Sequence, residues 1–273
     1  AMARKYLSYF QGPIAEWEAP DPRRLRHVVP ENRLRSYEVR DAIHGMADVD
    51  SVLELRPEFG IGIVTAFIRI EGKPFGIIAN NPKHLGGAID GPAADKASRF
   101  MQLCDAFDVP LISLCDSPGF MVGPEAEKTG LVRHVCRMFV TARSISVPLF
   151  GVVLRKCYGL GAQAMLAGGT YDDFFTVAWP TGEFGPMGLE GAVRLGYRKE
   201  LDAVEDPDEK QALYDRLLDE MYQQGKAIKV AETLEVDAVI DPVETRQWIL
   251  GGLRATRLRP PMSGRKRPFV DAW

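Results

Sequence analysis

The stretch VPLFGVVLRKCYGLGAQAM (147–165) indicates the fold class. Its first part, 147–155, is apolar on both faces, as a parallel strand covered by helices requires. Two glycines and then small residues follow, so the strand leads through a glycine turn into a short helix from about residue 159. A strand that passes directly into a helix is the repeating unit of α/β proteins.

Outward from this stretch, strands and helices alternate. Short connections between such elements favour right-handed crossovers. The pattern therefore predicts a mostly parallel sheet flanked by helices. The expected strands are 109–116 and 173–179, and the expected helices are 92–107, a helix ending at about 144, and one near 188–197.

The N-terminal side of this region reads differently. Residues 1–34 are rich in Pro and Arg and predict an extended arm or linker. A helix is expected to begin with Ser36 as its N-cap. Two β-branched runs, 61–70 and 74–80, predict a hairpin closed by the three-residue loop Glu71-Gly72-Lys73.

The last third predicts a helical extension of one domain that spans 35–257. Residues 207–231 are typical of one long amphipathic helix, 236–241 of a short strand, and 242–255 of a final helix. The basic, Pro-rich residues 258–273 predict an extended tail.

Composition excludes several classes of protein. The formal net charge is -3, so there is no basic surface typical of nucleic-acid binding. No run of 18 apolar residues occurs, so no membrane span is expected. The four cysteines are widely spaced and form no C-x-x-C pair, which disfavours a metal site or a disulfide framework and favours a reducing cytoplasm.

The glycine turn is the first candidate site. Gly159 and Gly161 lie where the strand becomes a helix, so the N–H groups of the first helical turn point outward without partners. Two such groups can stabilise an enolate or oxyanion. The turn therefore predicts an oxyanion hole. The alternative is that the two glycines only allow close packing of helix and strand.

The same residues also match the dinucleotide-binding pattern G-x-G-x-x-A, which ends at Ala164. Three features disfavour that interpretation. The motif follows several β/α units instead of opening the first one. A polar bulge, 155–158, is expected between strand and turn. The next strand ends in Ala-Trp-Pro and offers no acidic residue for a ribose.

Two further loops carry backbone groups. Asp116-Ser117-Pro118-Gly119-Phe120 follows a strand directly, at the sheet edge where α/β folds bind ligands, although an ordinary turn explains it equally. His84-Leu85-Gly86-Gly87-Ala88 offers a second set of N–H groups. Side-chain catalysts are few, since His134 falls in mid-helix and no nucleophile or metal motif occurs. Such a site suits a reaction whose base is carried by a cofactor.

As an ordered set, five strings carry a family resemblance. The chain resembles, from about residue 6 to 257, the C-terminal, biotin-side half of the carboxyltransferase of biotin-dependent acyl-CoA carboxylases, such as propionyl-CoA carboxylase β. The strings are IEGKPFGIIANNP (70–82), DKASRFMQLCDAFDVPLISLCDSPGF (95–120), TGLVRH (129–134), VVLRKCYGLGA (152–162) and AWPTGEFGPMGLEGAV (178–193).

The resemblance implies a crotonase-like ββα superhelix. It implies an active site between the N-terminal half of one subunit and the C-terminal half of another. The cofactor would be biotin, as carboxybiotin on a carrier, and the substrate an acyl-CoA. Biotin N1 would take the α-proton, and backbone amides would hold the charge on the biotin urea oxygen.

Ungapped matching to the family places these amides on Leu160 and Gly161, where the family often has Gly-Ala. Gln163 stands where family members often have Asp, so the resemblance does not determine the acyl group of the substrate. Because Gln is neutral, a larger or more apolar acyl group is possible. The resemblance implies biotin or substrate contacts at Gly159, Ala162, Gln163, Gly119, Phe120, Gly87, Ala88 and Tyr158.

The implied partners are the N-terminal carboxyltransferase half, biotin carrier and biotin carboxylase modules, and further copies of the chain in a homo-oligomer. The chain is expected to be a fragment that lacks full activity alone. Two alternatives stay open. One is another crotonase-fold CoA enzyme, a decarboxylase-type carboxyltransferase or a hydratase, which would need a carboxylate or His at the amides. The other is a non-catalytic assembly domain.

Overall fold

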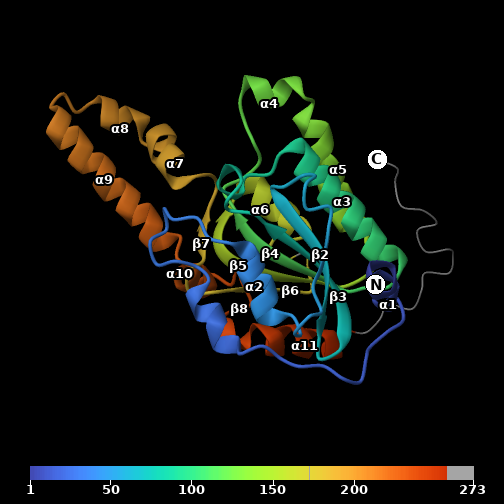
Figure 1. Ribbon diagram of the computed structural model, residues 1–273. Helices are drawn as coiled ribbons and strands as arrows, with labels where there is room; N and C mark the ends of the chain where they lie inside the picture. The colour runs from blue at the N-terminus through green and yellow to red at the C-terminus, as the bar shows by residue number, and fades with distance from the viewer. Residues whose placement is uncertain (172, 257–273) are drawn as a thin grey trace.

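The structure, a computed structural model, describes residues 1–171 and 173–256. Within them one sheet has the order β1-β2-β3-β4-β5-β6-β8, and β7 pairs with the end of β5 (Figure 1). The β1–β2 and β2–β3 pairs are antiparallel and all later pairs are parallel. The strands are β1 (Leu53–Leu55), β2 (Ile63–Ile70), β3 (Lys73–Asn80), β4 (Leu111–Ser117), β5 (Leu149–Tyr158), β6 (Phe175–Ala178), β7 (Glu183–Gly185) and β8 (Ala238–Val239).

Helices cover both faces of this sheet, as the apolar strands require. Elements α3, α5 and α6 pack on one face, and η1, α2 and α11 pack on the other. The predicted mixed α/β fold with a mostly parallel sheet is confirmed. The helices are α1 (Met2–Ser8), η1 (Pro22–His27), α2 (Val39–Met46), η2 (Leu85–Gly87), α3 (Gly91–Ala106), α4 (Pro124–Lys128), α5 (Leu131–Ser144), α6 (Gly159–Met165), α7 (Leu189–Gly196), α8 (Arg198–Asp202), α9 (Pro207–Gln224), α10 (Ala227–Glu232), η3 (Pro242–Glu244) and α11 (Thr245–Ala255).

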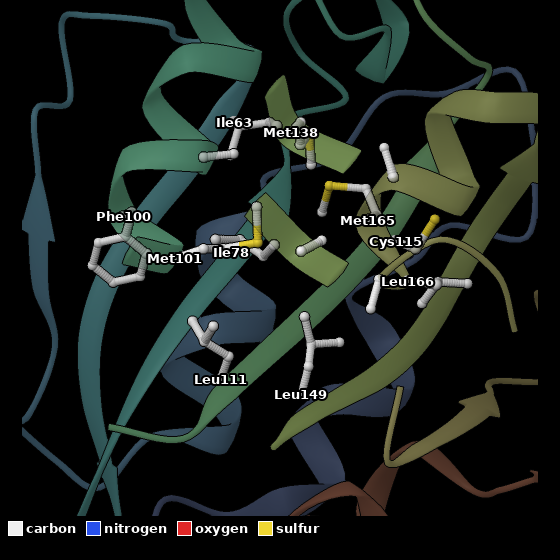
Figure 2. Close-up of a cluster of buried hydrophobic side chains, with 14 of the residues drawn as sticks. Ile63, Ile78, Phe100, Met101, Leu111, Cys115, Met138, Leu149, Met165 and Leu166 are labelled. Carbon is white, nitrogen blue, oxygen red and sulfur yellow. The ribbon is translucent and has the colours of Figure 1, made fainter. Parts of the chain in front are cut away.

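The two faces carry separate apolar cores. In the first core, strand residues such as Ile78 and Leu111 meet Met101, Met138 and Met165 from the three covering helices (Figure 2). In the second, alternate residues of the same strands meet α2 and α11. The period of two along each strand thus divides its side chains between the cores.

The starts of α3 and α9 follow from local sequence. The side chain of Asp90 accepts a hydrogen bond from the Ala93 N–H at 2.9 Å, and a proline stands in the first turn of α3. Asp206 caps α9 in the same way, before Pro207. An acidic cap satisfies an N–H that has no partner within its helix, and proline there sacrifices no bond.

Two expectations for the N-terminal half were wrong in detail. The α2 helix is capped by Glu38, which accepts from the Arg40 N–H, and not by Ser36. The hairpin loop has two residues, because Ile70 pairs with Lys73. Glu71 and Gly72 have φ of 50° and 74°, the positive values that tight hairpin turns need.

The ends of the chain also differ from the prediction. Residues 1–34 contain α1 and η1, which lie partly in the cores, and are not simply extended. The single helix expected over 207–231 is instead two helices, α9 and α10. Between them the Gly225 carbonyl accepts from the Phe184 N–H of β7, and Lys226 forms an isolated β-bridge with Glu183. Helix α9 buries no residue and projects from the sheet with α7 and α8 (Figure 1). The predicted tail 258–273 lies outside the described residues.

Truncation of Phe67 should test the first core. Phe67 is fully buried, so Phe67→Ala should lower the free energy of unfolding by about 3–5 kcal/mol. Denaturant unfolding would measure this, with Leu195→Ala on exposed α7 as a control near zero. Equal effects of the two substitutions would contradict the assigned core. The Phe67 ring packs against the rings of Tyr6, Tyr9, Phe10 and Phe100.

Candidate functional site

The candidate site begins where β5 becomes α6. Strand β5 continues through Tyr158 and pairs with β7, so residues 155–158 belong to the strand. Its register against β4 shifts here, from Val153 opposite Cys115 to Cys157 opposite Ser117, an irregularity at the position of the expected bulge. Gly159 then has φ of 55°, and a Cβ there would lie 2.7 Å from the Pro186 carbonyl oxygen. Both facts require glycine at the first residue of α6.

The N–H groups of Leu160 and Gly161 lie in the first turn of α6, and no side chain of the described residues caps this turn. The preceding Tyr158 provides no cap, because its hydroxyl donates to Glu183 at 2.9 Å instead. Burial, together with the neighbouring Glu183 carboxylate, raises the pKa of Tyr158 and keeps it a neutral donor. The two amides are therefore available to an acceptor from outside the chain.

A groove of about 790 Å³ runs beside this turn. Gly159, Leu160, Ala162 and Gln163 form one wall of it. The rest of the lining comes from residues that the sequence analysis did not name as site residues, although some of them lie in the family-like string 178–193. These residues include Thr170, Tyr171, Phe184, Gly185, Pro186, Leu189, Met221, Gln224, Gly225, Val230 and Glu235.

Gly161 is packed against backbone. A Cβ on Gly161 would lie 2.6 Å from the carbonyl carbon of Gly119. The Gly119 carbonyl accepts from the Ile89 N–H at 3.1 Å, and the Met121 N–H donates to Ile89 at 2.9 Å. The loops that precede α3, follow β4 and open α6 are thus joined. All the glycine loops singled out in the sequence meet at one edge of the sheet.

The remaining predicted contacts lie around this junction and do not line the groove. Gly87 packs on the Asp116 carbonyl, where a Cβ would be 2.2 Å away, and Ala88 is buried. The Phe120 ring packs against Phe139 of α5. Together with Gly119 and Tyr158, these residues form the framework around the turn, whereas Gly159, Ala162 and Gln163 face the groove.

A buried carboxylate supports the junction. Asp116 is fully buried at the end of β4 and accepts the Lys156 N–H at 3.1 Å. The Arg155 guanidinium lies 3.2 Å from the second carboxylate oxygen, at ion-pair distance but without hydrogen-bond geometry. The Lys156 ammonium lies 3.6 Å from the carboxylate and also donates to the Gly86 carbonyl. Lys156 thereby links the ends of β4 and β5 to η2.

Asn80 makes a second link of this kind. Its side-chain oxygen accepts the Asp116 N–H at 3.1 Å, and its side-chain nitrogen donates to the Gly87 carbonyl at 3.5 Å. Sequence reasoning missed both Asn80 and Lys156. The available signal was a polar residue at the end of an otherwise apolar strand, which needs a specific partner once buried.

Other chemistries find little support near the turn. His134 pairs with Asp95 at 2.7 Å, and His84 lies 3.4 Å from Asp90. Over the described part of the chain, no cluster of three or more His, Cys, Asp or Glu side chains could hold a metal ion. No helix there is both long and apolar enough to cross a membrane.

Comparison with known proteins identifies the family. The carboxyl transferase domain family matches residues 2–266. This chain belongs to that family. It is 37% identical to the methylmalonyl-CoA carboxyltransferase 12S subunit of Propionibacterium freudenreichii subsp. shermanii, over 84% of this chain and 43% of that protein. It is 34% identical to the propionyl-CoA carboxylase carboxyltransferase subunit of Haloferax mediterranei, over 88% of this chain and 46% of that subunit.

A solved structure agrees with this assignment. A single-chain, multi-domain long-chain acyl-CoA carboxylase is 58% identical to this chain and superposes with a TM-score of 0.85. That match covers 92% of this chain and 24% of the carboxylase chain. The chain also spans about half the length of the curated relatives that it matches. The family match and this superposition confirm the crotonase-like fold that the resemblance implied.

Lys156 provides a test of the junction. In Lys156→Met, Asp116 loses one of its cations and the Gly86 carbonyl loses its donor, so unfolding should become easier by roughly 1.5–3 kcal/mol. Hydrogen exchange of the Gly87 and Ala88 amides, which bond within η2, should accelerate more than exchange in the sheet. Lys199→Met on exposed α8 is the control. Unchanged exchange in η2 would contradict the supporting role of Lys156.

Proposed function

We propose that this chain is the biotin-side half of the carboxyltransferase of an acyl-CoA carboxylase, which transfers CO₂ from carboxybiotin to the α-carbon of an acyl-CoA. The observation that carries the proposal is the uncapped first turn of α6, which holds the N–H groups of Leu160 and Gly161 and places Leu160 on the groove wall. Membership of the carboxyl transferase family supports it. Two fixed amide donors are what a developing oxyanion requires.

The residues present fit a biotin ring. The groove has the size of a small-molecule site, and Gly159 and Ala162 leave its wall next to the amides free of large side chains. When bound, carboxybiotin supplies both the carboxyl group and the base for the α-proton. The amides of Leu160 and Gly161 would hold the urea oxygen as it gains negative charge. This assignment of the base to the cofactor is consistent with a site of backbone donors, in which His84 and His134 lie beside carboxylates instead.

The surrounding residues have different roles in this proposal. Gly159, Ala162 and Gln163 contact the ligand, because they line the groove. Gly87, Ala88, Gly119, Phe120 and Tyr158 hold the turn in place, because they are packed or bonded around it. Gln163 is neutral, which favours a larger or more apolar acyl group. The similarity to a long-chain acyl-CoA carboxylase supports that choice.

The proposal requires partners. An acyl-CoA would be bound by an N-terminal carboxyltransferase half, and carboxybiotin would arrive on a carrier charged by a biotin carboxylase module. The relatives are about twice as long as the region that matches this chain, which supports a separate N-terminal half as a partner. A transcarboxylase 12S structure, 35% identical over 93% of this chain with a TM-score of 0.80, is described as a hexamer, which supports a homo-oligomer. Four free thiols support a reducing cytoplasm.

Gly161→Ala should test the oxyanion amides in the assembled enzyme. The added Cβ would displace the turn, because the Gly119 backbone allows it no space. We expect the carboxylation rate constant to fall by roughly 10²–10³-fold, the cost of losing one oxyanion donor. Leu160→Ala is the matched control, since it keeps the amide and removes only an exposed side chain. A normal rate for Gly161→Ala would reject the proposal.

A second experiment separates the open alternatives. The 273-residue chain alone should fail to carboxylate acyl-CoA with carboxybiotin at the rate of the complete enzyme, and adding an N-terminal half should restore turnover. Products from a panel of acyl-CoAs would be analysed in both reactions. Hydration of an enoyl-CoA would identify a hydratase, and CO₂ release without acceptor a decarboxylase. Biotin binding without any turnover in the assembled enzyme would indicate an assembly domain.

A further inference from the structure

A second cavity, of about 430 Å³, lies between α1, β1, β2 and α3. It shares no lining residue with the groove beside α6. Its wall contains cationic and apolar side chains together. The lining residues are Tyr6, Leu55, Arg56, Thr65, Lys96, Arg99, Phe100 and Leu103.

Lys96 is the unusual member of this wall. Its side chain is 2% exposed, and its ammonium has no hydrogen-bond partner among the described residues. Burial lowers the pKa of Lys96 to about 8, against the opposing effect of Glu54. The Glu54 carboxylate is already held by the Arg40 guanidinium, at 2.8 and 2.7 Å. A buried ammonium without a partner is costly, so an anion in the cavity would stabilise it.

Two guanidinium groups add to the positive charge. Arg56 and Arg99 both line the cavity. Burial and then repulsion from Arg99 lower the pKa of Arg56. Like charges are thus kept close around a space that a negative group could fill.

The rest of the wall is apolar. Leu55, Leu103 and the ring of Phe100 contribute hydrocarbon surface, and the Tyr6 ring closes the α1 side. A volume of about 430 Å³ is in the range of small-molecule sites and is far larger than a single inorganic anion needs. The cavity therefore suits a molecule that has both an anionic group and an apolar body.

We propose that this cavity binds an amphipathic carboxylate, with its carboxylate at Lys96 and its hydrocarbon body against Leu55, Phe100 and Leu103. A bound acid joins α1 to β1, β2 and α3. Its carboxylate would pair with the Lys96 ammonium, and its hydrocarbon body would bury the apolar side chains of the cavity. The site is independent of the carboxyl-transfer groove, so its presence does not depend on the function proposed for that groove.

Sodium octanoate is the probe, titrated into the 273-residue chain by calorimetry with thermal unfolding as a second readout. We expect saturable binding and a rise in Tm, because a ligand that binds only the folded chain stabilises it. Octanol tests the charge, and inorganic phosphate tests the apolar body. Each should bind at least about tenfold more weakly than octanoate, a difference of about 1.4 kcal/mol.

Lys96→Met is the decisive variant. Methionine has a similar length and leaves no partner unpaired, so the variant should fold with a Tm at or above that of the original chain. Octanoate binding should weaken by about tenfold or more, the value of one charged hydrogen bond. Lys229→Met is the matched control, since Lys229 is exposed and pairs with Glu232 on α10.

Three outcomes would overturn the proposal. Octanol that binds as tightly as octanoate would reveal a purely apolar cavity. Phosphate that binds as tightly would reveal a simple anion site. Octanoate binding that survives in a folded Lys96→Met variant would place the ligand elsewhere.

Discussion

The candidate site depends on one buried carboxylate, that of Asp116. A charge in the interior must be paired, and its partners are then held in position. Here the partners come from neighbouring strand ends. Arg155 and Lys156 lie at the end of β5, and Asn80 at the end of β3. Two of these partners, Lys156 and Asn80, extend to the carbonyls of η2, so one buried charge fixes where two loops meet the turn into α6.

The same network connects the N-terminal segment to the site. The Arg155 guanidinium donates to the carbonyls of Arg33 and Arg35, and it lies over the ring of Tyr37 at 5.0 Å. Burial and the nearby Asp116 carboxylate raise the pKa of Tyr37. The segment before α2 is therefore part of the framework of the sheet edge. Its irregular backbone is held by a cation whose other partner is Asp116.

The fold could be predicted from sequence where one pattern dominates. Strands β4 and β5 and helix α3 lie within a few residues of the expected positions, because apolar runs and an Asp-Gly-Pro start are local signals. The break after α9 could not be predicted, since it depends on hydrogen bonds with distant residues, such as the one that the Ala227 N–H donates to the Gly182 carbonyl. The turn into α6 was predicted as a site, but the rest of the groove lining was not. No local sequence pattern indicates that the end of α9 lies beside α6.

The two interpretations of the glycines at α6 are not exclusive. Gly161 packs on the backbone of Gly119 so closely that no side chain fits, which is the packing interpretation. That same contact fixes where the Gly161 N–H lies, which is what an amide-based site needs. Leu160 has no such contact and its side chain is exposed, so its amide can donate whatever the side chain is. A backbone site therefore constrains residue 161 strongly and residue 160 weakly, so a leucine at residue 160 is physically consistent with the proposed chemistry.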